Sequence, residues 1–169
     1  PQVRHRGTIG GSLAYGDPAS DLPAVMLALG AEFAITGRGG ERTVAAAEFF
    51  TGVFQTAVGQ GELLTEIRVP KLGDSTGWSY LKYHRRAQDW ATVAVAAARV
   101  NGHVNVGLAS MGPVPVRAHG VEQAVAGGAS PADAAVHAAE GTEPPSDVSG
   151  SSEYRAHLAQ VLVRQALEQ

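Results

Sequence analysis

The stretch with the clearest potential for chemistry lies near the start of the sequence, where residues 4–12 read RHRGTIGGS and two aspartates follow. Glycines let backbone N–H groups approach an anion closely, and the hydroxyl groups of Thr8 and Ser12 add neutral donors. Asp17 and Asp21 are placed to accept hydrogen bonds from the hydroxyl groups of a sugar. The spacing alone is as compatible with a plain glycine-rich turn as with a phosphate-binding loop.

Composition limits the classes of protein to which the chain can belong. Its 169 residues suffice for one ordinary domain or two small ones, and a hydrophobic content of 44% permits a packed core. A net charge of -3 without a basic block argues against a nucleic-acid partner. The absence of cysteine excludes disulfides, thiol catalysis and cysteine-held iron–sulfur clusters from this sequence.

Metal sites and membrane segments are not expected either. The histidines show neither HxH nor HExxH spacing, so we predict no metal site. No apolar run approaches the length of a membrane span and no charged-then-apolar leader is recognisable. We therefore expect no membrane span and a cytoplasmic protein.

Hydrophobic patterning predicts a mixed module over residues 1–70. An apolar run closed by Gly30 predicts a buried helix over 22–29. Strands are predicted over 31–36 and 62–70, and a hairpin-type turn follows the first of them. Phenylalanines at helical spacing predict a further helix over 45–54 with its aromatic side chains in the core.

A polar segment over 71–76 separates this module from a second one over residues 77–169, for which three antiparallel strands and three helices are predicted. The strands are expected over 77–84, 92–100 and 103–111, and Asn101-Gly102 between the last two is a typical hairpin turn. Val104, Val106 and Leu108 should share one strand face. The helices are expected to begin near Pro115, Ser130 and Ser152. The last helix should carry an apolar stripe of Tyr154, Leu158, Val161 and Leu162. Residues 142–151 should form a surface linker.

Two motifs and the strand ending in Pro70 together resemble one family, the FAD-binding (medium) subunits of molybdenum hydroxylases of the carbon monoxide dehydrogenase and xanthine dehydrogenase type. The first motif is R-x-R-G-T-I-G-G-S with D-P-A-x-D behind it, and the second is K-Y-x-x-R-x-x-D-x-A over residues 82–91. The resemblance covers essentially the whole chain. It implies an α+β fold: the C-terminal part of a two-lobed flavin-binding domain over 1–70, then a three-stranded antiparallel sheet packed with helices over 77–169.

The resemblance also implies a set of FAD-binding residues and no catalytic residue. The second of two glycine-rich loops that hold the FAD pyrophosphate would be Thr8, Ile9, Gly10, Gly11 and Ser12, with Arg4 and Arg6 adding favourable charge. Asp21 would contact the cofactor through hydroxyl groups, with Asp17 a weaker candidate. Leu64 would lie against the cofactor, Lys82 near it, and Tyr83 close to the flavin ring.

The residues themselves leave simpler roles open. These alternatives are a turn at Asp17-Pro18, a helix cap at Asp21, a core position for Leu64, a solvated edge lysine at Lys82, a surface salt-bridge cluster of Arg85, Arg86 and Asp89, and an interface or core role for Trp90.

In the family that the sequence resembles, a large molybdopterin-binding subunit hydroxylates the substrate, and [2Fe–2S] clusters on a small subunit pass electrons to this subunit's FAD and then to an external acceptor. Relatives carry a preceding segment with the first glycine-rich loop, which this sequence lacks. We therefore expect weak FAD binding by this chain alone. We also expect exposed apolar surface and self-association of residues 1–70, because the helix over 22–29 and Phe49, Phe50 and Phe54 would lose part of their cover.

A non-catalytic remnant or assembly module that docks partner subunits without FAD is the alternative. A nicotinamide-binding Rossmann unit fits less well, because TIGGS is not the GxGxxG fingerprint.

Overall fold

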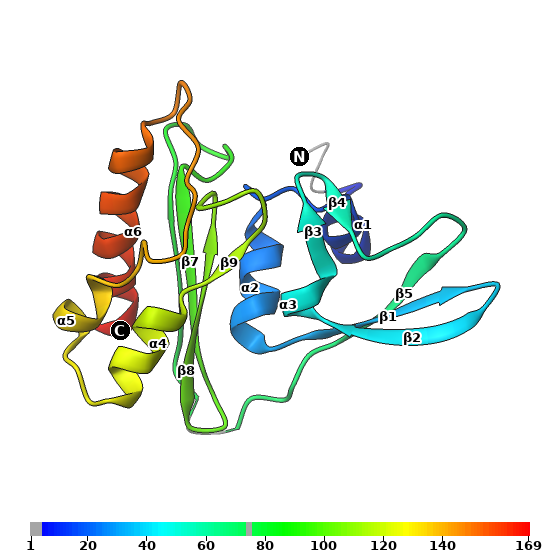
Figure 1. The fold of residues 1–169 in the computed structure, drawn as a ribbon, viewed down its shortest axis with the longest axis horizontal. Coiled ribbons are helices and arrows are strands. Elements are labelled where there is room, and N and C mark those ends of the chain that lie inside the picture. Colours follow the sequence, from blue (N-terminus) through cyan, green and yellow to red (C-terminus); the bar gives the residue numbers. More distant parts are fainter. Residues whose placement is uncertain (1–4, 74–75) are drawn as a thin grey trace.

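A computed structural model describes residues 5–73 and 76–169, and it confirms an α+β fold in which two antiparallel sheets lie on either side of one helix, α2 (Figure 1). The first part contains α1 (Ile9–Tyr15), α2 (Asp21–Leu29), β1 (Glu32–Gly37), β2 (Gly40–Ala45), α3 (Ala46–Phe49), β3 (Phe50–Gly52), β4 (Gln55–Thr56) and β5 (Leu63–Arg68). The second part contains β6 (Trp78–Tyr83), β7 (Val93–Val100), β8 (His103–Ala109), β9 (Val116–Arg117), α4 (His119–Ala126), α5 (Pro131–Ala135) and α6 (Ser152–Leu167).

The first sheet has the strand order β2-β1-β5 and is antiparallel throughout. The predicted strands and the turn between β1 and β2, where Gly37 pairs with Gly40, are confirmed. An aromatic cluster forms its core: the ring centroids of Phe33 and Phe49 are 4.3 Å apart, and those of Phe49 and Phe50 are 5.1 Å apart. Because Phe49 and Phe50 are buried under β1 and α2, the expectation that they lose their cover is wrong.

The predicted helix over 45–54 is wrong beyond Phe49. α3 is only four residues long, and Phe50 begins the short strand β3. Phe54 adopts a left-handed backbone conformation with φ 55° in the turn to β4, where its exposed ring lies tilted against Tyr15 with the ring centroids 5.0 Å apart. A change from helix to strand lets the adjacent Phe49 and Phe50 side chains both enter the core, so tertiary packing overrides the helical spacing.

The second sheet has the order β6-β7-β8-β9 and contains the predicted three strands. Asn101 and Gly102 have φ values of 51° and 83°, which confirms the hairpin turn. The prediction that Pro115 opens a helix is wrong: the two-residue strand β9 follows it and adds a fourth strand, since Val116 pairs with Leu108. α4 begins only at His119.

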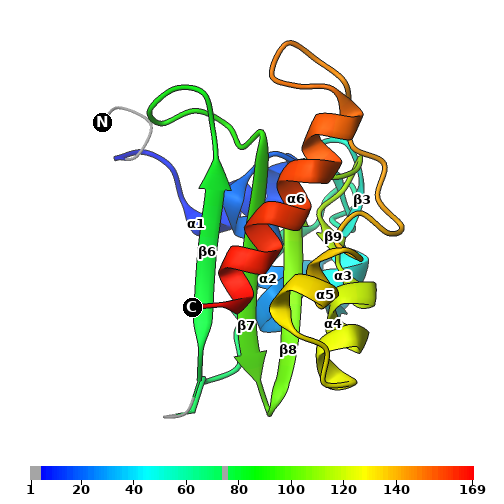
Figure 2. The same ribbon diagram turned by 90° about the vertical axis from the view of Figure 1, so that its left-hand side faces the viewer.

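Both faces of this sheet are covered, by α2 on one side and by α4, α5 and α6 on the other (Figures 1 and 2). Val104, Val106 and Leu108 share the face toward α6, as predicted. The opposite face carries small residues, and Ala24 and Ala28 of α2 pack against them. Because Met26 and Leu27 of the same helix enter the aromatic core, α2 belongs to both hydrophobic cores.

The C-terminal helix is confirmed, but its predicted apolar face is only partly correct. Leu158 and Leu162 contact the core, whereas Tyr154 and Val161 are 40% and 36% exposed. The buried positions include Arg155. The predicted cap at Ser130 is also confirmed, because its hydroxyl accepts a hydrogen bond from the amide of Asp133 at 3.2 Å.

Candidate functional site

The glycine-rich stretch does not form a loop beyond Thr8, because Ile9, Gly10, Gly11 and Ser12 form the first turn of α1. Thr8 is the N-cap of this helix, and its hydroxyl accepts a hydrogen bond from the amide of Gly11 at 3.0 Å. The Ser12 amide bonds to the Thr8 carbonyl. Across residues 5–73 and 76–169, no hydrogen bond uses the amides of Ile9 or Gly10, which leaves these two donors free at an exposed helix start.

The segment between α1 and α2 is tied down by its own side chains. The hydroxyls of Ser12 and Ser20 lie 3.1 Å apart. One Asp17 carboxylate oxygen accepts from the amide of Ala19 at 2.9 Å, which is the turn that the simpler interpretation expects. The other oxygen accepts from the indole N–H of Trp90 at 2.9 Å. Asp17 therefore connects the start of the chain to the loop after β6.

Asp21 and Lys82 come from opposite parts of the chain and meet. The Lys82 ammonium lies 3.0 Å from a carboxylate oxygen of Asp21, and the Lys82 side chain is only 21% exposed. Lys82 is therefore not a solvated edge lysine. Asp21 is the first residue of α2 and Ser20 is its cap, so the cap predicted at Asp21 is wrong by one position.

Tyr80 lies beside this pair, two residues before Lys82 on β6. Its hydroxyl is buried without a hydrogen-bond partner among the described residues. Burial, and secondarily the Asp21 carboxylate, raises the pKa of Tyr80 above its ordinary value. Tyr80 was not among the residues suggested by the sequence, which predicted only the strand that carries it.

Tyr83 ends β6, and its carbonyl accepts from the amide of Thr92 at 2.8 Å, which closes the loop over residues 84–91. Its ring meets the edge of Tyr154 from α6 at 6.3 Å, and the neighbouring Tyr83 raises the pKa of Tyr154. Both rings are 40% exposed. The Tyr83 ring is therefore accessible at the same end of the sheet as the Asp17–Trp90 contact.

The surface salt-bridge cluster that the sequence leaves open as a simpler role for this loop does not form among the described residues. Within the described chain, no ion pair includes Arg85, Arg86 or Asp89. Arg85 instead donates to the carbonyl of Val148 at 2.7 Å, and Trp90 is exposed rather than in the core. Arg4 lies outside the described residues.

Leu64 is separated from the Asp21–Lys82 pair, because it lies on β5 of the first sheet. It pairs with Ile35 of β1 and packs against the aromatic core, as the simpler interpretation expects. Since α1 packs against β5, Leu64 belongs to the same side of the molecule as the glycine-rich turn.

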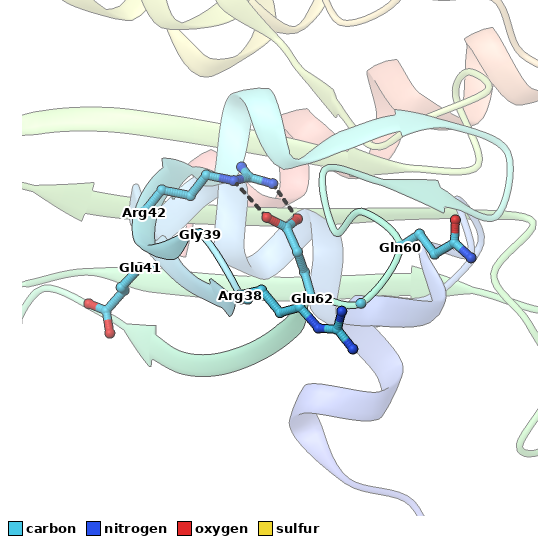
Figure 3. Close-up of a pocket in the computed structure, with 9 residues that line it drawn as sticks. Arg38, Gly39, Glu41, Arg42, Gln60 and Glu62 are labelled. Atoms are coloured by element: carbon cyan, nitrogen blue, oxygen red, sulfur yellow. Dashed lines mark hydrogen bonds and ion pairs between the residues drawn. The ribbon is translucent and has the colours of Figure 1, made fainter.

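A hollow at the far end of the first sheet includes none of the predicted site residues (Figure 3). It lies between the β1–β2 turn and residues 60–62. Arg42 and Glu62 form an ion pair of 2.7 Å at its wall, and the Glu62 carboxylate also accepts from the amide of Gly59. The Arg42 hydrogen bond is the main cause that holds the pKa of Glu62 below its usual value. The Arg42 and Glu62 charges neutralise one another, whereas Arg38 and Glu41 also line this hollow.

Two family models match the sequence. The FAD binding domain in molybdopterin dehydrogenase matches residues 1–72, and the CO dehydrogenase flavoprotein C-terminal domain matches residues 78–169. The chain belongs to the FAD-binding medium-subunit family of molybdenum hydroxylases.

This chain is similar to carbon monoxide dehydrogenase medium chains over nearly its full length. The chain from Afipia carboxidovorans is 41% identical and the one from Hydrogenophaga pseudoflava 38% identical, each over 99% of this chain. A solved carbon monoxide dehydrogenase from Hydrogenophaga pseudoflava, which lacks the Mo-pyranopterin moiety of the molybdenum cofactor, superposes with a TM-score of 0.94 at 40% identity, covering 99% of this chain and 62% of that one. This chain spans 62% and 61% of the two medium chains.

Two further observations concern the described residues only. No helix over residues 5–73 or 76–169 has the length and hydropathy needed to cross a membrane. In the same ranges, no three histidine, aspartate or glutamate side chains gather where they could hold a metal ion.

Proposed function

We propose that this chain is part of an FAD-binding electron-transfer subunit of a cytoplasmic molybdenum hydroxylase complex. Residues 1–70 would be the C-terminal half of the FAD-binding domain and residues 77–169 the flavoprotein C-terminal domain. Electrons would arrive from [2Fe–2S] clusters on a small partner subunit and leave to an external acceptor, while a large molybdopterin-binding subunit oxidises the substrate. FAD supplies the redox chemistry when it is bound, and the chain supplies binding and orientation.

The first turn of α1 carries this proposal, because its donors suit the pyrophosphate of FAD. The amides of Ile9 and Gly10, which have no partner among the described residues, lie at a helix start, where the helix dipole favours an anion. A methyl group added at Gly10 would meet no atom of the described chain within 4 Å. Glycine inside a helix costs about 1 kcal/mol relative to alanine. Nothing in the chain itself requires glycine there, whereas a closely approaching phosphate does.

The hydroxyls contribute less than the sequence suggests. The Thr8 oxygen already accepts from Gly11, and Ser12 and Ser20 share one hydrogen bond. In the serine pair one hydroxyl hydrogen is used and the other stays available to an acceptor. We therefore assign phosphate binding mainly to the two amides, with Ser12 as a secondary donor.

Asp21 and Lys82 would act as a pair. The carboxylate would accept hydrogen bonds from cofactor hydroxyls while the Lys82 ammonium holds its orientation at 3.0 Å. Tyr83 would place its exposed ring beside the flavin, and Leu64 would line the cofactor from β5. Arg6 would add positive charge near the phosphates.

The test is the flavin content of the full-length gene product, measured by its absorbance near about 450 nm, a property of the oxidised cofactor. Gly10→Asp adds a negative charge that suits the helix N-terminus but repels a phosphate, so flavin content should fall about tenfold, while the melting temperature of the flavin-free protein should not fall. Gly39→Asp adds the same charge at another open glycine and should retain the flavin.

Two outcomes would contradict the proposal. Unchanged flavin content in Gly10→Asp would exclude the α1 turn as the phosphate site. A wild-type protein without flavin that still co-purifies with partner subunits would favour the docking module. Exposed apolar side chains such as those of Ile9, Leu63 and Trp78 are the surface that such a module would use.

A further inference from the structure

We propose that Arg155 is a positioning residue, which fixes the loop over residues 84–91 and thereby Tyr83. The inference rests on the proposed function only in placing Tyr83 beside the flavin. The connections that carry it are hydrogen bonds within this chain.

Arg155 lies one turn into α6 and is 2% exposed. It is the only charged residue among the buried ones in the described chain. A guanidinium removed from water is costly unless it is paired and hydrogen-bonded. Arg155 must therefore make interactions that an apolar residue at this helix position could not make.

The guanidinium of Arg155 reaches the start of β7. It donates one hydrogen bond to the carbonyl of Thr92. The amide of Thr92 in turn donates to the carbonyl of Tyr83 at 2.8 Å. The Thr92 carbonyl thus binds α6, and the Thr92 amide binds Tyr83. Thr92 therefore links Arg155 to the end of β6.

The same guanidinium also holds the turn over residues 147–150. Arg155 donates to a carboxylate oxygen of Asp147 at 2.6 Å, and the amide of Ser149 donates to the same carboxylate at 2.7 Å. Although burial alone would raise the pKa of Asp147, the hydrogen bonds from Ser149 and Arg155 lower it. Asp147 stays ionised and paired at neutral pH. The predicted surface linker is therefore anchored at this point.

A surface hydrogen bond also joins the turn over residues 147–150 to the loop over residues 84–91. Arg85 in the loop donates to the carbonyl of Val148 at 2.7 Å, and the Val148 side chain is 93% exposed at the tip of the turn. The Tyr154 ring next to Arg155 meets the Tyr83 ring. Three connections start from the first turn of α6 and run through Thr92, Asp147 and Tyr154. Together they hold the backbone of Tyr83, its ring and the loop that follows it.

A purely structural arginine would predict a different result from a positioning one. Loss of a merely structural arginine would lower the melting temperature and leave the surroundings of the flavin unchanged in the folded molecules. Loss of a positioning arginine would change the local mobility of residues 84–92 and the asymmetric environment of the flavin while the rest of the fold stays intact.

The experiment uses the full-length gene product with its bound flavin. Arg85→Gln weakens one connection without leaving a buried unpaired charge. Asp147→Asn keeps a hydrogen-bond acceptor for Arg155 but removes its countercharge. Arg155→Lys restores part of what Arg155→Met removes. Arg164→Gln is the matched control, because the single ion pair of Arg164 within the described residues is with Glu168 on the exposed side of α6. Amide hydrogen exchange of residues 84–92 and 147–150 and the visible circular dichroism of the flavin are the readouts.

We expect exchange in both segments to rise about tenfold in Asp147→Asn and Arg155→Met, less in Arg85→Gln and Arg155→Lys, and not in the control. The flavin dichroism should change in the same order, while exchange in the C-terminal turns of α6 stays constant. Unchanged exchange in residues 84–92 with a folded variant would overturn the inference. If the wild-type protein holds no flavin, the proposed function fails and the exchange measurement alone decides the role of Arg155.

Discussion

The two faces of the four-stranded sheet are packed by different means. Toward α4, α5 and α6 the sheet presents valine and leucine side chains, and volume filling forms the contact. Toward α2 it presents alanines and Gly107, and the helix backbone comes close to the strands. β7 shows the contrast within one strand, because Val93 and Val95 face one side and Ala94 and Ala96 the other.

This difference shows how the site is assembled. The face toward α2 carries Tyr80, whose hydroxyl lies beside the Asp21–Lys82 pair, and a close helix brings Asp21 within reach of Lys82 from β6. The other face anchors the C-terminal helix and Arg155. One face therefore sets the distance between the two parts of the chain, and the other holds the C-terminal helix on the sheet. The two faces should respond differently to substitution.

Gly107→Val should have the largest effect. A Cβ at Gly107 would lie 2.2 Å from the carbonyl oxygen of Ala24, which belongs to the backbone of α2 and cannot rotate away. We expect a loss of about 4 kcal/mol or more in the free energy of unfolding, above the usual range for overpacking. Urea unfolding measures it. The same substitution at the open Gly39 should change stability by less than about 1 kcal/mol, and equal effects would show that the α2 face is not tightly packed.

Leu108→Ala tests the opposite face and should cost about 3 kcal/mol, because a fully buried side chain is replaced by a cavity. Since this face is packed by side-chain volume rather than by close backbone approach, Leu108→Met should lose much less stability than Leu108→Ala. The Asp21–Lys82 distance should be unaffected in the folded variant. A crystal structure showing α2 displaced by this substitution would contradict the separation between the two faces.

Asn105→Ala removes a polar contact from the α2 face. The Asn105 amide donates to the carbonyl of Ala28 at 2.9 Å, near the C-terminal end of α2. We expect a loss of about 1–2 kcal/mol in urea unfolding, because a partly buried carbonyl is left without its donor and Arg117 loses the Asn105 oxygen as an acceptor. Gln123→Ala on the exposed side of α4 is the comparison and should be nearly neutral.

Tyr80→Phe should have the smallest effect at neutral pH, where it leaves stability unchanged or raises it by up to about 1 kcal/mol, because an unpaired buried hydroxyl is removed. Because the folded-state pKa is raised, the stabilisation from neutral Tyr80 is fully present below the unfolded value near 10.0 and is lost as the pH rises above it. Tyr80→Phe should therefore show a shallower loss of stability above pH 10 than the wild type.

Urea unfolding between pH 7 and pH 11 measures this difference. Tyr15→Phe, at an exposed position, should reproduce the wild-type profile. Identical profiles for Tyr80→Phe and the wild type would contradict the assigned environment of Tyr80.

The sequence by itself determined those features that depend on neighbouring residues. Asn101-Gly102 specified a hairpin because both residues tolerate positive φ, Gly30 ended α2, and alternation placed Val106 and Leu108 on one face. The two motifs likewise sufficed to identify the family. Each of these is a local pattern that the chain carries wherever it is folded.

Only the tertiary structure decided the features that depend on distant contacts. The phenylalanine spacing predicted a helix, yet the core required both Phe49 and Phe50 and ended α3 between them. No sequence pattern marked Arg155 as a buried residue, yet it is buried where it donates to the Thr92 carbonyl and to Asp147. Asp21 and Lys82 meet across 61 positions because α2 packs closely on an alanine face. Such pairings are set by the free energy of the whole packed molecule, which no local pattern contains.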